Sequence, residues 1–444
     1  MIKTVKWIGV AMAAATALGA GAQTTRQEMY ANPDLNGGVY YAYPVTESAN
    51  TPAPKGYQPF YISHYGRHGS RYLISDRDYT SVLAVLDSAR RAGKLTPLGL
   101  DVAARLDTVW LEAKGRGGEL SPLGYRQHRG IAQRMYKAYP QVFDTKPASV
   151  KGMEQIYAGA PELSARSTTV MRCAHSMFAF IEALKELNPD LVIPRESGER
   201  DMYYMNHHTE SSNRLHDTGG VTREANKNFK ASKTHPDRLM SALFNDSVYV
   251  RDRVVPADLM WGLYWIAIDM QNMESPIRFY DIFTPEELFD LWQVFNFNFY
   301  SRNSSYPAAK GAFTDNAKNL VRNIAETADQ YVNEGKRGAT LRFGHDGNIV
   351  PLTALLQLEG CIAYVSDPDS LYKEYTDFRI SPMGSNFQMI LFRNKEGNIL
   401  AKFMQNEREV HIPAPTDNFP FYDWSVARQW LQTVIDTPSG EFIK

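Results

Sequence analysis

Two β-prone runs of the sequence each end in a glycine-flanked loop that carries charged and titratable side chains. Residues 60–64 lead into Gly66-Arg67-His68-Gly69-Ser70-Arg71, and residues 339–343 lead into Gly344-His345-Asp346-Gly347-Asn348. The glycines on both sides of each charged core permit a tight turn at the carboxyl end of the strand. Strands that end in such loops and are followed by helices are the units from which α/β folds are built.

A third unit of the same kind lies between these two. Residues 155–159 predict a strand and residues 160–164 a loop. From Val170 onward, apolar residues recur at steps of four and three, which predicts a long helix. Arg166 is expected in the first turn of this helix, where free backbone N–H groups favour an anion.

The alternation of strands and helices predicts the fold class, which is an α/β protein with a mostly parallel sheet core flanked by helices. In parallel sheets, ligands bind beyond the carboxyl ends of the strands. All three loops belong at that edge, so we expect them to form one site. The side chains expected to gather there are Arg67, His68, Arg71, Arg166, His345 and Asp346.

The chain has 444 residues, a length that predicts two or three domains, or one core that carries a large insertion. The stretch between the second and third units has few strand signals and indicates a helical cap inserted into the core. We predict a core of residues 23–74, 119–190 and 336–444, and a cap of residues 75–118 and 191–335. The best helical segments of the longer insertion are 234–244, 256–272, 284–298 and 314–334.

Further elements follow from capping and turn signals. Thr96 and Ser121 each precede a proline, a pattern typical of a helix that begins with a hydroxyl cap. The runs Phe387–Phe392 and Ile399–Gln405 flank an Asn-Lys-Glu-Gly-Asn turn, which predicts a β-hairpin. An amphipathic pattern predicts a last helix over residues 422–435.

The N-terminus indicates export. Two lysines precede an apolar run from Trp7 to Ala20, and an Ala-Gly-Ala site follows, so residues 1–22 predict a signal peptide cleaved after Ala22. A membrane anchor is the alternative, but the run is shorter than the roughly 20 residues that a span needs. The mature protein is therefore expected to be soluble and periplasmic or secreted, with no membrane span. Residues 23–58 are polar and are predicted to lack regular structure.

Composition excludes several classes of protein. The hydrophobic fraction of 43% and the charged fraction of 22% are ordinary for a globular protein and exclude disordered and fibrous chains. Lysine plus arginine, at 48, nearly equals aspartate plus glutamate, at 49, so no basic field exists to hold nucleic acid. Two cysteines, Cys173 and Cys361, form one disulfide or none.

The charged residues of the loops suit a phosphate ester. A guanidinium binds two phosphate oxygens at once and stays protonated. His68 is the candidate nucleophile, because a neutral imidazole can attack phosphorus, and nearby arginines would keep it neutral in mild acid. Asp346 can protonate the leaving alcohol and then activate water. This scheme requires no metal and no other cofactor.

Together, Arg67-His68-Gly69-Ser70-Arg71, the later Arg166 and His345-Asp346 resemble the signature of the histidine acid phosphatases. This family is the second branch of the histidine phosphatase superfamily and includes phytases and multiple inositol polyphosphate phosphatases. The resemblance spans most of the mature chain in the same order and includes Leu120-Ser121-Pro122-Leu123-Gly124.

The resemblance implies an α/β core with a helical cap and a small phosphorylated substrate. It implies that His68 is the nucleophile and Asp346 the proton donor, and that His345 hydrogen-bonds the phosphoryl group. The phosphate-holding arginines that it implies are Arg67, Arg71 and Arg166.

Two departures leave the substrate open. The family usually has proline two residues after the second arginine, where this chain has Leu73. The inositol polyphosphate branch usually has His-Ala-Glu, whereas His345-Asp346 is like the acid phosphatases and bacterial phytases. Ser70-Arg71-Tyr72, in contrast, is closer to the inositol polyphosphate branch. Tyr72 and Arg77 are weaker candidates for substrate binding, Arg77 for a second phosphate.

We therefore expect an exported phosphomonoesterase that acts on inositol polyphosphates. The alternatives are a broad acid phosphatase for sugar or small organic phosphates, a phosphate-ester binding protein without catalysis, and a phosphomutase. Because nucleophile and acid are both present, the binding protein is disfavoured. Export and the long helical insertion disfavour the phosphomutase. The oligomeric state stays open.

Overall fold

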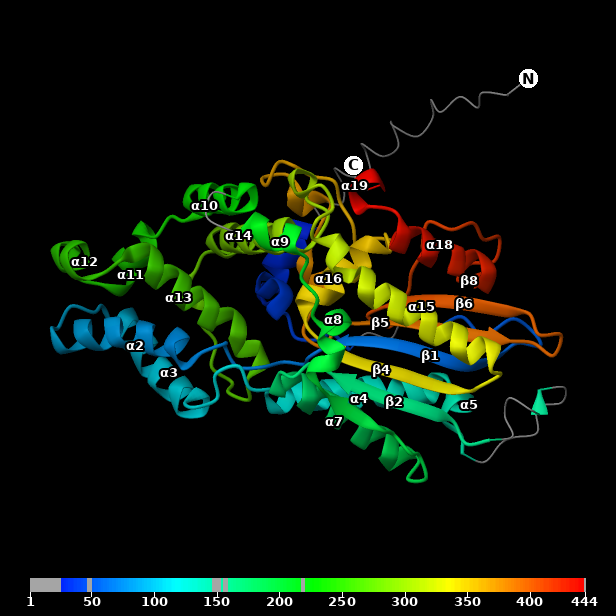
Figure 1. Cartoon of the computed structure of the whole chain (residues 1–444). Coiled ribbons are helices and arrows are strands. Elements are labelled where there is room, and N and C mark those ends of the chain that lie inside the picture. The colour runs from blue at the N-terminus through cyan, green and yellow to red at the C-terminus, as the bar shows by residue number, and fades with distance from the viewer. Residues whose placement is uncertain (1–24, 46–49, 146–152, 155–158, 217–219, 443–444) are drawn as a thin grey trace, which may run out of the picture.

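The computed structural model describes residues 25–45, 50–145, 153–154, 159–216 and 220–442. A central sheet lies between two layers of helices, and a helical lobe stands at one end of the sheet (Figure 1). The α/β class with helices on both faces of the sheet is thus confirmed. The predicted signal peptide lies outside the described residues.

The sheet has eight strands in the order β3-β2-β4-β1-β5-β6-β7, with β8 paired to β6 on the side. Parallel pairing joins β3, β2, β4 and β1. The strands are β1 (Gln58–Arg67), β2 (Glu162–Ser167), β3 (Arg195–Ser197), β4 (Gly338–Gly344), β5 (Asn386–Arg393), β6 (Ile399–Gln405), β7 (Arg408–Glu409) and β8 (Phe421–Asp423).

From β5 onward the sheet is antiparallel. β5 returns beside β1 in the opposite direction, and the predicted hairpin forms β5 and β6. A turn of a few residues cannot make the long crossover that a parallel pair needs, so this half must be antiparallel. The sheet is therefore mixed, and less of it is parallel than the sequence indicates.

Helices cover both faces of the sheet. One layer holds α4 (Pro122–Ala138), α5 (Pro140–Phe143) and α7 (Met171–Leu187), and the other holds α15 (Lys318–Asn333), α16 (Asp346–Leu355) and α18 (Trp424–Asp436). Side chains alternate along β1 between these layers. Tyr61 stacks on Tyr331 of α15 with ring centroids 4.2 Å apart. Ile62 instead joins the apolar cluster that includes residues of α4 and α7.

The helical lobe, called the cap here, faces the carboxyl ends of β1 and β4 (Figure 1). Its helices are α2 (Asp76–Arg91), α3 (Pro97–Ala113), α10 (Val221–Lys233), α11 (Asp237–Leu243), α12 (Ser247–Arg253), α13 (Pro256–Asp269) and α14 (Pro285–Asn303). One continuous apolar cluster joins the cap to the α15 layer. α15 lies within the range assigned to the cap from sequence, but it packs against β1 and α18.

The remaining helical elements are short. They are α8 (Met202–Met205), α9 (Glu210–His216), α17 (Asp377–Ile380) and α19 (Ser439–Phe442), with the 3-10 turns η1 (Pro33–Tyr40), η2 (Glu199–Asp201), η3 (Met270–Asn272), η4 (Tyr280–Ile282), η5 (Pro307–Ala309), η6 (Thr314–Ala317) and η7 (Leu371–Lys373).

The capping signals of the sequence are confirmed. The Thr96 hydroxyl accepts a hydrogen bond from the Gly99 N–H at 3.0 Å, at the start of α3. The Ser121 hydroxyl accepts one from the Gly124 N–H at 3.4 Å, at the start of α4. Each hydroxyl satisfies a backbone donor that the first turn of the helix leaves free.

The prediction that residues 23–58 lack regular structure is wrong for most of residues 25–40, and it agrees with the structure over 41–45 and 50–57. Residues 25–31 are helical, and η1 follows them. Residues 33–43, called the N-terminal strap here, run between cap and core. The Tyr264 hydroxyl of α13 donates to the Asn36 carbonyl at 2.7 Å, and the Met383 N–H of the core donates to the Tyr41 carbonyl at 2.8 Å. Tertiary contacts that no local pattern reveals thus order this polar segment.

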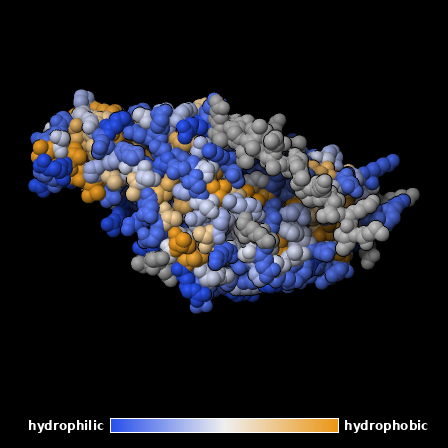
Figure 2. All heavy atoms as spheres, turned by 90° about the horizontal axis from the view of Figure 1, so that it is seen from above, coloured by the Kyte–Doolittle hydropathy of each residue, from blue (hydrophilic) through white to orange (hydrophobic). Residues whose placement is uncertain are grey.

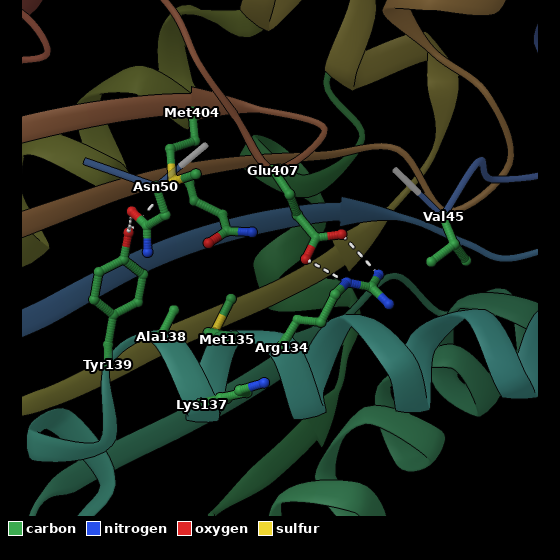
Figure 3. A pocket seen from close by; sticks show the side chains of 10 residues that line it. Val45, Asn50, Arg134, Met135, Lys137, Ala138, Tyr139, Met404 and Glu407 are labelled. Atoms are coloured by element: carbon green, nitrogen blue, oxygen red, sulfur yellow. Dashed lines mark hydrogen bonds and ion pairs between the residues drawn. The ribbon is translucent and has the colours of Figure 1, made fainter. Parts of the chain in front are cut away.

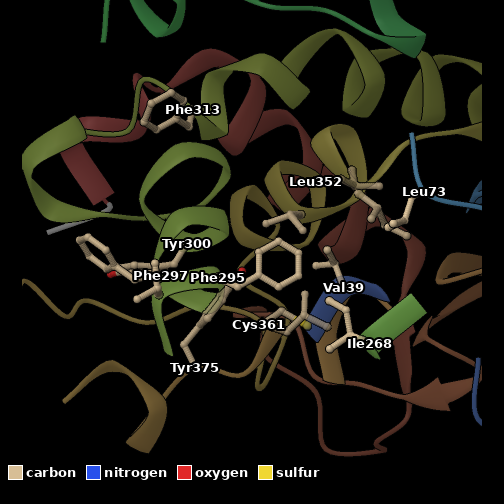
Figure 4. Close-up of a cluster of buried hydrophobic side chains, with 14 of the residues drawn as sticks. Val39, Leu73, Ile268, Phe295, Phe297, Tyr300, Phe313, Leu352, Cys361 and Tyr375 are labelled. Atoms are coloured by element: carbon tan, nitrogen blue, oxygen red, sulfur yellow. The ribbon is translucent and has the colours of Figure 1, made fainter. Parts of the chain in front are cut away.

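The strap lies very close to the residues around it. Gly38 has φ of +54°, and a β-carbon there would lie 2.5 Å from Asp377 Oδ2, so glycine is required. Figure 4 shows Val39 of the strap beside Phe295 and Ile268 of the cap in the buried apolar cluster. The strap is therefore part of the interior that cap and core share.

One face of the molecule is mostly hydrophilic (Figure 2). Figure 2 shows hydrophilic residues over most of one face, with apolar residues scattered among them. In the part of the chain that the structure describes, no helix is both long and apolar enough to cross a membrane. Cys173 and Cys361 are both buried free thiols, so the open question of a disulfide is resolved.

Buried His64 predicts a loss of stability in acid. It packs between the rings of Phe180 and Phe343, and burial lowers its pKa to about 3. Between pH 6.5 and that value the unfolded chain binds the proton more tightly, so stability falls as pH falls. In His64→Leu, the drop in unfolding free energy from pH 7 to pH 4.5 should be about 2–3 kcal/mol smaller than in wild type.

Urea unfolding at both pH values measures this difference. His235→Leu is the matched control, because His235 is exposed. An equal drop in wild type and His64→Leu would contradict the buried, neutral state of His64.

Candidate active site

The carboxyl ends of β1 and β4 bring the first and third loops together. Arg67 pairs with Gly344 in the parallel register, and the His68 N–H donates to the Gly344 carbonyl at 2.9 Å. The nucleophile candidate and the His345-Asp346 pair therefore leave adjacent strands at the same point. This is the edge at which parallel sheets bind ligands.

Arg67 is fully buried and makes three directed contacts. Its Nη2 lies 2.7 Å from Asp346 Oδ2, in an ion pair. Its Nη1 donates to the Ser381 carbonyl at 2.7 Å and to the Val39 carbonyl of the strap. The guanidinium is thus fixed by strand β4's loop, by the strap and by the loop before β5.

His68 is buried and held in one tautomer. Its Nδ1 lies 2.9 Å from the Gly69 carbonyl oxygen, which can only accept, so Nδ1 carries the proton and Nε2 keeps its lone pair. Burial first, and then the charges of Arg67, Arg172 and Arg71, lower the pKa of His68 well below its usual value. A neutral imidazole with a free Nε2 is a nucleophile in acid as well as at neutral pH.

The loop that carries His68 is held by two helices. A β-carbon on Gly69 would lie 2.6 Å from the Gly124 carbonyl oxygen of α4, so glycine is needed there. The Gly69 N–H donates to Ser176 of α7 at 3.1 Å. His128 of α4 contacts the Arg67 carbonyl through Nε2 at 3.1 Å. These contacts leave the loop little freedom to move.

Arg71 stacks over an aromatic ring of the strap. Its guanidinium carbon lies 4.5 Å from the centre of the Tyr40 ring, and Nη1 donates to the Tyr72 carbonyl at 2.8 Å. Buried Asp269, at the end of α13, interacts electrostatically with Arg71. Burial raises the pKa of Asp269 to about 7. Cap and strap thus both orient the second arginine.

His345 and Asp346 lie at the N-terminus of α16. His345 Nε2 lies 3.1 Å from the Thr168 hydroxyl, and its ring meets the His68 ring edge-on with centroids 5.8 Å apart. Burial and the nearby arginines lower its pKa to about 4, with Asp346 acting against them. Burial would raise the pKa of Asp346, yet the charge of Arg67 and its neighbours lowers it. His345 thus contacts the end of β2, and Asp346 contacts the end of β1.

The structure places Arg166 elsewhere. β2 begins at Glu162 and runs through Ser167, later than the strand predicted at 155–159, of which 155–158 lie outside the described residues. Alternation along β2 sends Arg166 to the α15 face, where its Nε lies 3.6 Å from Glu196 and 3.6 Å from Asp201. Arg166 is therefore a partly exposed residue of β2 that is paired with acids.

Arg172 takes the position that the sequence analysis assigned to Arg166. It lies in the first turn of α7, and its charge acts on His68, Arg71 and His345. The helical periodicity already began at Val170, so this signal could have identified Arg172. Its neighbour Cys173 packs its Sγ 3.6 Å from His345 Nε2.

The two weaker candidates, Tyr72 and Arg77, have other surroundings. Tyr72 is buried, donates to Glu112 at 3.1 Å and lies under the Arg116 guanidinium at 4.3 Å. Arg77 is exposed in the first turn of α2. Among the described residues, no group of three or more His, Cys, Asp or Glu side chains could hold a metal ion.

A separate cavity of about 580 Å³ lies along the second half of α4. Figure 3 shows Arg134 and Glu407 paired across it, beside Met135, Met404 and Tyr139. Arg134 stands ten residues beyond Gly124 on α4, which is about 15 Å along a helix. This cavity is therefore distinct from the cluster of arginines and histidines.

Comparison with known proteins decides the family. The model of the histidine phosphatase superfamily (branch 2) matches residues 66–406, which is most of the chain. The chain belongs to branch 2 of the histidine phosphatase superfamily. It is accordingly a histidine-type phosphatase, as the sequence resemblance predicts. No curated protein sequence matches the chain.

Solved structures of this phosphatase fold resemble the chain at low identity. The multiple inositol polyphosphate phosphatase of Bifidobacterium longum in complex with phosphate superposes with a TM-score of 0.76 at 18% identity, over 91% of this chain and 99% of that chain. The D. castellii phytase gives 0.64 at 15% identity, over 91% and 85%. The Hafnia alvei phytase gives 0.52 at 13% identity, over 88% and 99%. These likenesses support the fold alone.

Arg166 and Arg172 are the two candidates for the third arginine that binds the phosphoryl group, and substituting each one tests which of them does so. Arg172→Ala should lower kcat/KM for an aryl phosphate at least a hundredfold, because it removes a guanidinium that acts on the reacting groups. Arg166→Ala should leave kcat/KM within about threefold of wild type, since its charge is paired with Glu196 and Asp201. Steady-state kinetics of both variants, with melting curves to check folding, measures the contrast. The reverse order of losses would contradict the site described here.

Proposed function

We propose that this protein is an exported phosphomonoesterase that hydrolyses inositol polyphosphates through a phosphohistidine on His68. The observation that carries the proposal is a neutral, buried His68 that lies among arginines with its Nε2 free. A substrate phosphoryl group can meet this nitrogen and the guanidinium groups of Arg67, Arg71 and Arg172 at the same time.

In the first step, His68 Nε2 attacks phosphorus. The P–N bond forms, the ester P–O bond breaks, and the leaving alkoxide takes a proton from Asp346. The positive charges of the arginines offset the charge that develops on the phosphoryl oxygens in the transition state. The imidazole stays held through its Nδ1–H to the Gly69 carbonyl.

In the second step, water attacks the phosphohistidine. Asp346, now a carboxylate, takes a proton from the water, the P–N bond breaks, and inorganic phosphate leaves. His68 returns to its neutral form, so each turnover consumes one water and needs no further reactant.

The ion pair between Arg67 and Asp346 opposes a role of Asp346 as proton donor, and a bound substrate would remove this obstacle. In the free enzyme the charge of Arg67 lowers the pKa of Asp346, which favours the carboxylate over the acid. A bound phosphate dianion would share Arg67 and bring negative charge close to Asp346. That change raises the pKa of the carboxyl group, so Asp346 becomes a proton donor when substrate is present.

The proposed substrate class rests on charge and on similar proteins. Three arginines gather at one anion site in a chain whose net charge is −1. The similar structures are a multiple inositol polyphosphate phosphatase, solved also with inositol hexasulfate, and phytases. The arginines account for the binding of one phosphoryl group, and the similar proteins support a substrate that carries several.

Export is proposed from the first 22 residues alone. Their two lysines, apolar run and Ala-Gly-Ala site support a cleavable signal peptide. A periplasmic or secreted phosphatase would meet phosphate esters outside the cytoplasm.

Inositol hexakisphosphate should be hydrolysed, and its kcat/KM should fall more steeply with salt than that of an aryl monophosphate. Exposed charges are screened over about 8–10 Å near physiological ionic strength, and a polyphosphate meets more of them. Release of inorganic phosphate across a salt series, with His68→Ala as the inactive control, measures both slopes.

Each alternative has its own outcome in this experiment. Hydrolysis of the aryl ester alone, or equal salt slopes, would replace the inositol polyphosphate proposal with a broad acid phosphatase. Binding without release of phosphate would indicate a binding protein. Transfer of phosphate within the substrate, seen by product analysis, would indicate a phosphomutase.

A further inference from the structure

We propose that Tyr40 of the N-terminal strap is a ligand of the phosphoryl group bound by Arg67, Arg71 and Arg172. This inference rests on the proposed function, because it places a phosphate in that cluster. It adds to the site a segment that lies far from the sequence motifs, before the first strand of the sheet.

Tyr40 lies against the arginines. Its ring centre is 4.5 Å from the guanidinium carbon of Arg71. Its side chain is also near enough to Arg67 and Arg172 for an electrostatic interaction with each. Tyr40 therefore contacts one guanidinium group of the site and lies near the other two.

Residues of α13, η3 and α14 hold Tyr40 in this place from several sides. The Asn272 side-chain amide donates to the Tyr40 carbonyl at 2.9 Å, and its oxygen accepts from the Ser70 hydroxyl at 2.7 Å. Trp265 and Phe295 of the cap pack on the ring, with centroids 5.9 Å and 5.8 Å away. A single asparagine thus ties the backbone of Tyr40 to the loop that carries Arg71.

The neighbouring residue of the strap serves the same site. The Val39 carbonyl accepts from Arg67 Nη1, and the Val39 N–H donates to buried Asp377 at 3.2 Å. Two consecutive strap residues therefore contact the first and second arginines of the catalytic motif. These contacts indicate that the N-terminal strap lines the active site and does not only cross the surface.

The phenol group of Tyr40 adds an uncharged hydrogen-bond donor to the three charged arginines. Its hydroxyl donates one hydrogen bond without adding charge, and its ring face favours the guanidinium that lies on it. A phosphoryl group offers three non-bridging oxygens, each of which accepts more than one hydrogen bond. Tyr40 can therefore donate to an oxygen while keeping Arg71 aligned for its own contact.

Tyr40→Phe separates the hydroxyl from the ring. The ring that packs on Arg71, Trp265 and Phe295 stays, so the melting temperature without ligand should stay close to that of wild type. The Ki of inorganic phosphate and the KM of an aryl phosphate should rise about 10- to 100-fold, as for loss of a hydrogen bond to a charged group.

Tyr41→Phe is the matched control. Tyr41 is the next residue of the strap, and its ring packs on Phe378, with centroids 6.5 Å apart. It should keep the wild-type Ki for phosphate. A thermal shift titration with inorganic phosphate gives the same comparison without turnover, and it includes His68→Ala, which should still bind phosphate.

Wild-type Ki and KM in Tyr40→Phe, with hydrolysis intact, would overturn the role of Tyr40 and leave the proposed function standing. Equal weakening of phosphate binding in Tyr40→Phe and Tyr41→Phe would also overturn it, since a loosened strap would then explain both. If wild type neither binds phosphate nor hydrolyses the aryl ester, the proposed function itself fails.

Discussion

The site depends on one buried positive charge at the end of the central strand. An isolated guanidinium in the interior is costly, because water no longer solvates it. Arg67 is tolerated there because Asp346 and the carbonyls of Val39 and Ser381 surround it. Those partners come from the β4 loop, the strap and the loop before β5. The hydrogen bonds and the ion pair of this one guanidinium therefore bring three distant segments of the chain together.

The same charge links structure to chemistry. Burial and then the charge of Arg67 lower the pKa of His68, and the same charge lowers the pKa of Asp346 against the effect of burial. The nucleophile is therefore neutral and the acid ionised before substrate binds. A phosphate dianion would become its next partner and would change the state of Asp346. The fold thus supplies a site in which binding the anion also prepares the proton that the leaving alcohol needs. The ion pair with Asp346 that stabilises buried Arg67 in the fold is thus also the contact that takes part in catalysis.

Local signals of the sequence predict the two loops whose residues are adjacent along the chain. Gly69 marks one of these loops in the sequence, and a β-carbon there would lie 2.6 Å from the Gly124 carbonyl oxygen. Arg166 shows the limit: both it and Arg172 lie near a helix start, and only the strand boundary at Ser167 decides which one reaches the site. Tyr40 lies beyond that limit, since a polar, proline-rich segment gives no periodic pattern. Its order arises from tertiary partners such as Asn272.

The central claim is that phosphate passes through His68, and trapping the intermediate tests it most directly. Asp346→Asn cannot activate water, so with an aryl phosphate, whose leaving group needs little help, the phosphoenzyme should accumulate. Rapid quenching into alkali followed by peptide mass spectrometry should find one phosphate on the His68 imidazole, and none in the double variant with His68→Ala. A phosphate on another side chain, or rapid turnover without a covalent intermediate, would contradict the mechanism.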